Sequence, residues 1–136
     1  MLNNTLMEPD VKLSRIRQIA IAADDINESM NFYKEKLGAE FIARYDPPGL
    51  VFFDFEGVRL LMEKGATKAT VYFWVEDIDS ACRELQDRGI SFDQPPHLIF
   101  PDSEGTFGPK GEEEWMAFFK DPAGNVLALA SRKKPG

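Results

Sequence analysis

Two stretches of the chain share one pattern of hydrophobic and polar positions. "RQIAIAADDINESMNFYKEKLGAEF" over residues 17–41 and "TVYFWVEDIDSACRELQDRGISF" over residues 70–92 each open on an alternating apolar run. Such alternation is typical of a strand with one buried face. Each run leads through Asp-Ile into a segment with helical spacing of apolar residues. The pattern predicts a strand, a helix and a short strand in each half, the short strands containing Phe41 and Phe92.

The predicted helices have recognisable beginnings and ends. Asp25 and Asp77 stand just before them, where a carboxylate can accept the free N–H groups of the first turn. Gly38 and Gly89 follow their last residues, as is common at helix C-termini. We interpret both aspartates as structural. The apolar positions that share one face are assigned to the core: Ile26, Met30, Tyr33 and Leu37 in the first helix, and Ile78, Cys82 and Leu85 in the second.

Further strands follow each helix. The first half continues with "LVFFDFEG" and "VRLLMEKG", and the second with a polar loop, "WMAFFKD", a "DPAGN" turn and "VLALASR". The order predicts an α+β fold of two βαβββ modules that form one curved, barrel-like mixed sheet with helices outside. We expect a flexible N-terminal arm at 1–14, one domain at 15–131 with modules at about 15–66 and 67–131, and a basic, solubilising tail at 132–136.

Composition narrows the class of partner. The 136 residues carry a net charge of −7, which argues against nucleic acid because phosphate binding needs a basic face. No apolar run has the length of a membrane span, and the N-terminus lacks the pattern of a secretory signal. The lone Cys82 cannot form an internal disulfide, which fits a cytoplasmic location. Because Cys82 falls on an apolar helix position, we interpret it as a buried structural thiol.

The order of motifs resembles the glyoxalase / bleomycin-resistance / dioxygenase superfamily, also called vicinal oxygen chelate proteins. The resemblance is carried by "DINESMNFYKEKLGAEF" and "FKDPAGNVLAL" and extends from about Arg15 to Ser131. It implies two βαβββ modules with a divalent metal at their junction, held by His or Glu on the first and last strands of each module. Because the superfamily includes isomerases, epimerases, dioxygenases, thiol transferases and drug-sequestering proteins, the resemblance specifies the fold and not the reaction.

Carried onto this chain, the ligand positions do not hold metal ligands. They correspond to Gln18, Leu61, Thr70 (or Tyr72 in the alternative register) and Ala128. Because a tight site for a transition metal needs about three protein ligands, no metal is expected at the usual positions and no cofactor is predicted. A weaker alternative is a divalent metal held by an unusual set, Glu63, His97 and Glu112.

Strand alternation predicts which side chains line the hollow of the sheet. The result is an apolar, aromatic pocket for a small molecule. Trp115 begins the penultimate strand and is expected either to cap the hollow or to belong to the core. The predicted ligand-binding residues are therefore Gln18, Leu61, Tyr72, Trp74, Trp115 and Ala128.

Catalytic chemistry, if present, would depend on the only histidine. His97 is suited to acid–base work near neutral pH, and Glu113 is its candidate partner. The structural alternatives are that His97 lies at the pocket rim or on the surface, and that residues 112–114 are a solvated run of charge. We therefore expect a small-molecule-binding protein with a degraded metal site, sequestering an apolar or aromatic ligand. The alternative is a lyase, isomerase or dioxygenase of the superfamily, with or without a metal. The resemblance also implies a homodimer.

Overall fold

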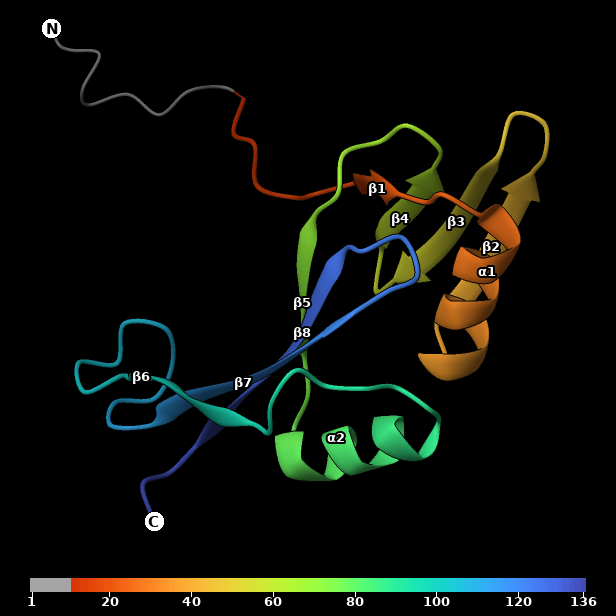
Figure 1. Ribbon diagram of the computed structural model, residues 1–136. Coiled ribbons are helices and arrows are strands. Elements are labelled where there is room, and N and C mark those ends of the chain that lie inside the picture. The colour runs from red at the N-terminus through yellow and green to blue at the C-terminus, as the bar shows by residue number, and fades with distance from the viewer. Residues whose placement is uncertain (1–10) are drawn as a thin grey trace, which may run out of the picture.

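The computed structural model describes residues 11–136 of the chain, in which the βαβββ order occurs twice (Figure 1). The first ten residues of the predicted arm lie outside the described residues, and 11–17 are exposed and belong to no element. The first module contains β1 (Gln18–Ala22), α1 (Ile26–Asn31), a π-helical turn η2 (Phe32–Lys36), β2 (Glu40–Tyr45), β3 (Leu50–Phe55) and β4 (Val58–Glu63). The second contains β5 (Thr70–Trp74), α2 (Ile78–Asp87), β6 (His97–Pro101), β7 (Glu113–Lys120) and β8 (Val126–Lys133).

The strands form two four-stranded sheets rather than the single curved sheet that was expected. Their orders are β1-β4-β3-β2 and β5-β8-β7-β6. In each sheet the first and last strands of the module are parallel neighbours, and the other pairs are antiparallel. The two sheets are separate. The edge strands β1 and β5 each pair with only one strand, the last strand of their own module. The α+β fold and the two βαβββ modules were predicted correctly.

The third strand of the second module begins later than predicted. Phe92 makes only an isolated bridge to Phe119, and the strand itself starts at His97. The two residues before it, Pro95 and Pro96, have no N–H group to donate to a neighbouring strand. The ladder with β7 therefore forms only after them.

Both predicted helix caps are present. The carboxylate of Asp25 accepts the N–H of Glu28 at 3.0 Å, and that of Asp77 accepts the N–H of Ser80 at 3.1 Å. Each helix then packs against its own sheet (Figure 1). The buried side chains of both modules form one hydrophobic cluster that includes Cys82. Burial, together with the nearby Asp79 carboxylate, raises the pKa of Cys82 to about 11, as expected for an inert structural thiol.

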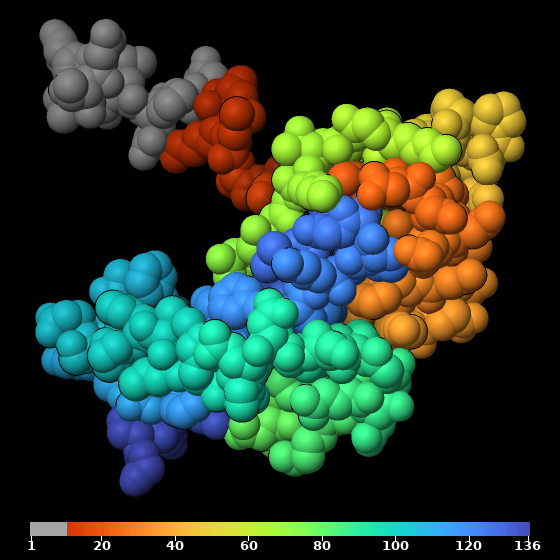
Figure 2. Space-filling model, viewed as in Figure 1, coloured from red at the N-terminus to blue at the C-terminus, as the bar shows by residue number. Residues whose placement is uncertain are grey.

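The turn at Asp121 to Asn125 joins the modules. Asp121 Oδ2 accepts the hydroxyl of Tyr33 at 2.7 Å and the amide of Asn125 at 2.8 Å. The Asn125 Nδ2 group also donates to the carbonyl of Ala22 at 2.7 Å, and Oδ1 accepts the N–H of Ala69 at 2.8 Å. Both turn residues are buried. In the space-filling view the turn region, coloured blue, sits directly against the orange residues of the first module (Figure 2).

The basic tail was predicted at 132–136, but the last strand continues through its first two residues. Arg132 and Lys133 are the last residues of β8 and pair with Glu114 and Glu113 of β7. The Arg132 side chain is only 8% exposed and forms ion pairs with three carboxylates. Strand pairing and these ion pairs keep it in the domain, so its charge serves the fold and not solubility.

Candidate functional site

Each sheet has a face turned away from its helix, here called the far face. Side chains on a strand alternate between faces. Because Phe73 and Leu129 line a cleft with residues of α2, their neighbours Tyr72 and Ala128 belong to the far face. By the same argument Leu61, which follows the core residue Leu60, lies on the far face of the first sheet. The structure thus places the predicted Gln18 and Leu61 on one far face, and Tyr72, Trp74 and Ala128 on the other.

The far face of the second sheet is aromatic and open. Tyr72 and Phe118 flank Ala128 in neighbouring strands, and their rings meet edge to face across it with centroids 6.2 Å apart. Ala128 is fully buried, whereas Tyr72 and Trp74 are 55% and 58% exposed. Exposed aromatic side chains offer apolar area and a polar edge to a ligand. In the single chain this surface, here called the aromatic shelf (Tyr72, Trp74, Phe118 and Ala128), is open to solvent at Tyr72 and Trp74.

The far face of the first sheet carries Arg59, between Gln18 of β1 and Asp54 of β3. The Nε group of Arg59 donates to Oε1 of Gln18 at 3.0 Å, because β1 and β4 pair with these two residues side by side. The oxygen with which Gln18 would meet a metal therefore already faces a guanidinium. No local sequence pattern indicates the contact of Arg59 with Gln18, because it depends on the parallel register of β1 and β4.

The residues at the expected ligand positions do not fit a divalent metal. Leu61 and Ala128 have no donor atom, and the space above Ala128 is taken by the two aromatic rings. Gln18 is bonded to Arg59, whose charge repels a second cation at short range. Across residues 11–136, no three His, Cys, Asp or Glu side chains gather in a way that could hold a metal. The alternative set of Glu63, His97 and Glu112 is thus not assembled.

His97 lies at the edge of the aromatic shelf. It pairs with Met116 across β6 and β7, and its ring centroid is 6.3 Å from that of Phe118. Its Nδ1 atom is 3.1 Å from the carbonyl oxygen of Pro95. When Nδ1 carries the proton it donates to this carbonyl, which leaves Nε2 as the acceptor. His97 is therefore positioned to contact a molecule lying on Phe118.

Glu113 and Trp115 are not brought to the same face. They alternate with Met116, so they lie on the helix side of the sheet. Trp115 donates through Nε1 to Glu113 at 3.2 Å, and the ammonium of Lys133 lies 4.2 Å from its ring centre. Lys133 in turn pairs with Asp79 of α2 at 2.7 Å. The structure thus places Trp115 with the core and separates Glu113 from His97.

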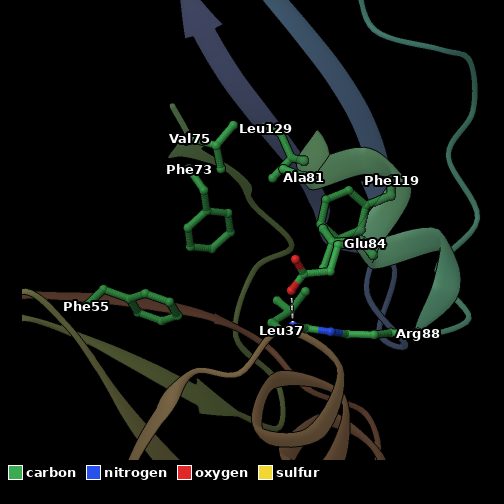
Figure 3. Close-up of a pocket in the computed structure, with 10 residues that line it drawn as sticks. Leu37, Phe55, Phe73, Val75, Ala81, Glu84, Arg88, Phe119 and Leu129 are labelled. Atoms are coloured by element: carbon green, nitrogen blue, oxygen red, sulfur yellow. Dashed lines mark hydrogen bonds and ion pairs between the residues drawn. The ribbon is translucent and has the colours of Figure 1, made fainter. Parts of the chain in front are cut away.

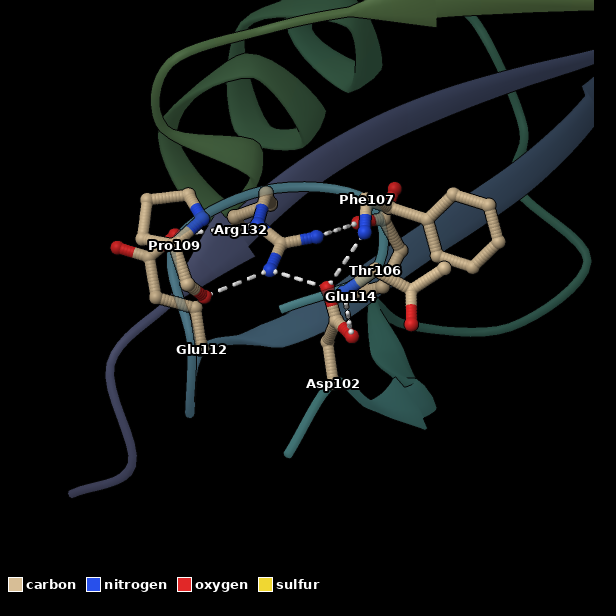
Figure 4. Close-up of polar contacts among 7 residues, drawn as sticks. All are labelled: Asp102, Thr106, Phe107, Pro109, Glu112, Glu114 and Arg132. Carbon is tan, nitrogen blue, oxygen red and sulfur yellow. Dashed lines mark hydrogen bonds and ion pairs between the residues drawn. The ribbon is translucent and has the colours of Figure 1, made fainter. Parts of the chain in front are cut away.

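A cluster of charges closes the loop between β6 and β7 (Figure 4). Arg132 pairs with Asp102, Glu112 and Glu114 at 2.9–3.1 Å and donates to the carbonyl of Pro109. Burial alone would raise the pKa of Asp102, but N–H groups of Phe107 and Thr106 and the Arg132 guanidinium together lower it. The expected solvated charge run at 112–114 is instead partly committed to this cluster.

A cleft between the modules, on the helix side, was not foreseen (Figure 3). Its volume is about 320 Å³. The sequence gives no signal for it, because the positions that line it have the same apolar spacing as a filled core. Only the placement of the second module against the first leaves space between them. The lining residues are Leu37, Phe55, Phe73, Val75, Ala81, Glu84, Leu85, Arg88, Phe119 and Leu129.

Comparison with known proteins identifies the class. Residues 15–129 match the model of the Glyoxalase/Bleomycin resistance protein/Dioxygenase superfamily. The chain belongs to this superfamily, as the resemblance predicted. No curated protein matches the chain in sequence.

Solved structures share the fold. A glyoxalase/bleomycin resistance protein/dioxygenase from Nocardioides is 21% identical with a TM-score of 0.71, over 93% of this chain and 88% of that one. Lactoylglutathione lyase from Agrobacterium tumefaciens is 22% identical with a TM-score of 0.67, over 87% and 93%. TnmS3, an antibiotic-binding protein from Streptomyces sp., is 20% identical with a TM-score of 0.68, over 89% and 98%. At these identities the likeness extends to the fold alone.

Proposed function

We propose that this chain is a metal-independent small-molecule-binding member of its superfamily, whose ligand is an apolar or aromatic compound held on the far faces. The observation that carries the proposal is the position of Ala128 beneath the rings of Tyr72 and Phe118. Where the resemblance implies a metal-binding carboxylate, this chain presents an aromatic surface. Stacking and edge contacts with such rings favour a flat organic ligand.

The Arg59 contact supports the same proposal. A guanidinium can stabilise an oxygen of a ligand by charge-assisted hydrogen bonds, without any metal. Gln18 holds Arg59 on the far face of the first sheet. The proposed site combines the apolar surface of the second sheet with the guanidinium of Arg59 on the first.

The exposed aromatic residues also support the proposed homodimer. Tyr72 and Trp74 leave more than half of their surface open in the single chain, and exposed apolar patches commonly mark interaction sites. A second copy placed over the far faces would enclose the ligand. Analytical ultracentrifugation should give twice the mass of one chain, and a monomer at all concentrations would contradict this part of the proposal.

From the sequence we also propose that the protein is located in the cytoplasm. Within the described residues, no helix combines the length and the hydrophobicity needed to cross a bilayer.

The experiment uses the only two tryptophans of the chain. Trp74 lies on the far face and Trp115 on the helix side, so quenching of their fluorescence reports on the two faces separately. A screen of aromatic compounds against the wild type should find ligands that quench fluorescence. That quenching should persist in Trp115→Phe and disappear in Trp74→Phe. Quenching that follows Trp115 instead would place the ligand on the other side of the sheet and contradict the proposal.

The second candidate is an enzyme that uses His97 as acid or base. The observation that favours it is the contact of His97 with the shelf through Phe118. Glu113 does not support it from the opposite face. His97→Ala should preserve ligand binding if the protein only sequesters its ligand. Turnover of a ligand by the wild type, lost in His97→Ala while binding persists, would favour the enzyme.

A further inference from the structure

We infer that the cleft between the modules is a second binding site, which accepts a small aromatic carboxylic acid of one or two rings. Its volume of about 320 Å³ lies at the lower end of the range for small-molecule sites. The cleft is independent of the far faces and would exist even if those faces bound nothing.

The walls are apolar and aromatic. Phe55 of the first module and Phe73 of the second lie with their ring centroids 5.2 Å apart, and Phe119 extends the aromatic lining (Figure 3). Phe55, Phe73 and Leu85 pack against the core but stay only partly buried. A flat ring inserted among them removes apolar surface from water on both sides.

The mouth carries an anchored cation. Arg88 Nη1 donates to the carbonyl of Lys36 at 3.0 Å, which ties α2 to the end of η2 in the first module. Its other terminal nitrogen pairs with Glu84, one helical turn earlier. The Arg88 side chain is 38% exposed and that of Glu84 is 64% exposed. Ion pairs of such exposed groups contribute little to stability.

Another carboxylate can therefore displace the exposed Glu84 from its ion pair with Arg88. A ligand carboxylate at the mouth can take its place on Arg88, whose position stays fixed by the carbonyl of Lys36. Guanidinium binds carboxylate through two parallel hydrogen bonds, which orients the ligand with its ring inward. The combination of aromatic walls and one held cation selects an aromatic acid over a neutral compound of equal size.

The cleft and the far face lie on opposite sides of the same strands. On β5 and β8, the cleft residues Phe73 and Leu129 alternate with Tyr72, Trp74 and Ala128. A ligand in the cleft thus touches the back of the strands that carry the shelf. Variants of one site can be tested without altering the other.

The experiment compares 2-naphthoate with its neutral match 2-naphthamide by isothermal titration calorimetry and by amide chemical shifts. The wild type should bind naphthoate more tightly, with shifts at Leu85 and Phe119. Arg88→Gln should weaken naphthoate binding about tenfold, the loss of one charge-assisted contact, and leave naphthamide unchanged. Arg83→Gln, on the same helix but outside the cleft lining, should change neither.

Two variants fill the cleft in case one of them does not fold. Ala81→Phe and Leu85→Phe each place a larger side chain in the lining and should abolish the amide shift at Phe119 with both compounds, whereas Trp74→Phe should leave that shift unchanged. The inference is overturned if neither compound binds. It is also overturned if naphthoate still shifts Phe119 in a folded cleft-filling variant, or if Arg88→Gln weakens the binding of both compounds equally. Loss of binding in Trp74→Phe would assign the compounds to the far face and likewise overturn it.

Discussion

The Asp121–Asn125 turn and the far faces of the sheets are both places where the chain can be compared with its superfamily. In the turn the motif is intact, and every polar group of Asn125 has a partner, in Ala22, Ala69 or Asp121. On the far faces the implied ligand positions hold Gln18, Leu61, Thr70 and Ala128. The difference shows that a buried polar junction can preserve the fold while the side chains of the binding surface differ from those that the resemblance implies.

The physical reason is the number of partners. The turn residues are buried and connect β1, η2 and the segment before β5 to β8, so a change there leaves several polar groups without partners. Gln18 makes one side-chain hydrogen bond, to Arg59, and Leu61 and Ala128 have no polar side-chain atom. A change at these positions therefore leaves at most one polar partner, Arg59, without its bond.

The largest expected effect is in the turn. Asn125→Ala removes bonds to Ala22, Ala69 and Asp121 and should lower the free energy of unfolding by about 3–5 kcal/mol. Urea denaturation measures it. Asn31→Ala, on the exposed side of α1, is the matched control and should change stability by less than about 0.5 kcal/mol. Equal effects of the two changes would contradict the importance of the turn.

A smaller effect is expected at the partner of the turn. Tyr33→Phe keeps the buried ring and removes the hydroxyl that donates to Asp121, so it should destabilise the protein by about 1–3 kcal/mol. Burial and the Asp121 carboxylate raise the pKa of Tyr33. The stabilisation from neutral Tyr33 is thus complete below about pH 10, the ordinary pKa of tyrosine, and is lost as pH rises further. Urea midpoints across alkaline pH should fall more steeply in the wild type than in Tyr33→Phe.

A third effect concerns the charge cluster at the end of the second sheet. The pKa of Asp102 is lowered in the folded protein. Its contribution to stability is therefore present above about pH 4, the ordinary pKa of aspartate, and is lost as pH falls below that. Arg132→Gln should lower the urea midpoint at neutral pH and weaken this acid dependence. Lys134→Gln, an exposed neighbour outside β8, should do neither, and an identical response of the two would count against the cluster.

The smallest effect on stability is expected on the far face. Gln18→Ala removes an exposed hydrogen bond to Arg59 and should change the free energy of unfolding by less than about 0.5 kcal/mol. The same change should weaken binding of ligands found by the tryptophan assay, because Arg59 loses its orienting partner. A large loss of stability, with binding unchanged, would mean that Gln18 serves the fold.

Prediction from the sequence was most successful where the signal is local. The caps at Asp25 and Asp77 and the apolar faces of the helices follow from spacing within one element. The roles of Arg59, Arg132 and the cleft depend on which strands become neighbours, and that is decided by tertiary packing. The local sequence around Arg132 predicts a basic tail, because no local pattern reveals the three carboxylates that tertiary packing brings to it from residues 102–114. The sequence is compatible with Trp115 in the hollow or in the core, and only the register of β7 with β6 decides its side.

The most direct test of the account is the metal content of the protein, produced without a histidine tag and dialysed after exposure to Zn²⁺, Ni²⁺, Mn²⁺ and Fe²⁺. Elemental analysis should find only substoichiometric metal, the same in the wild type and in Gln18→Ala, because Leu61 and Ala128 provide no donor and Arg59 faces Gln18. One ion per chain that is lost in Gln18→Ala would show that a cation binds on the far face, and would contradict the account.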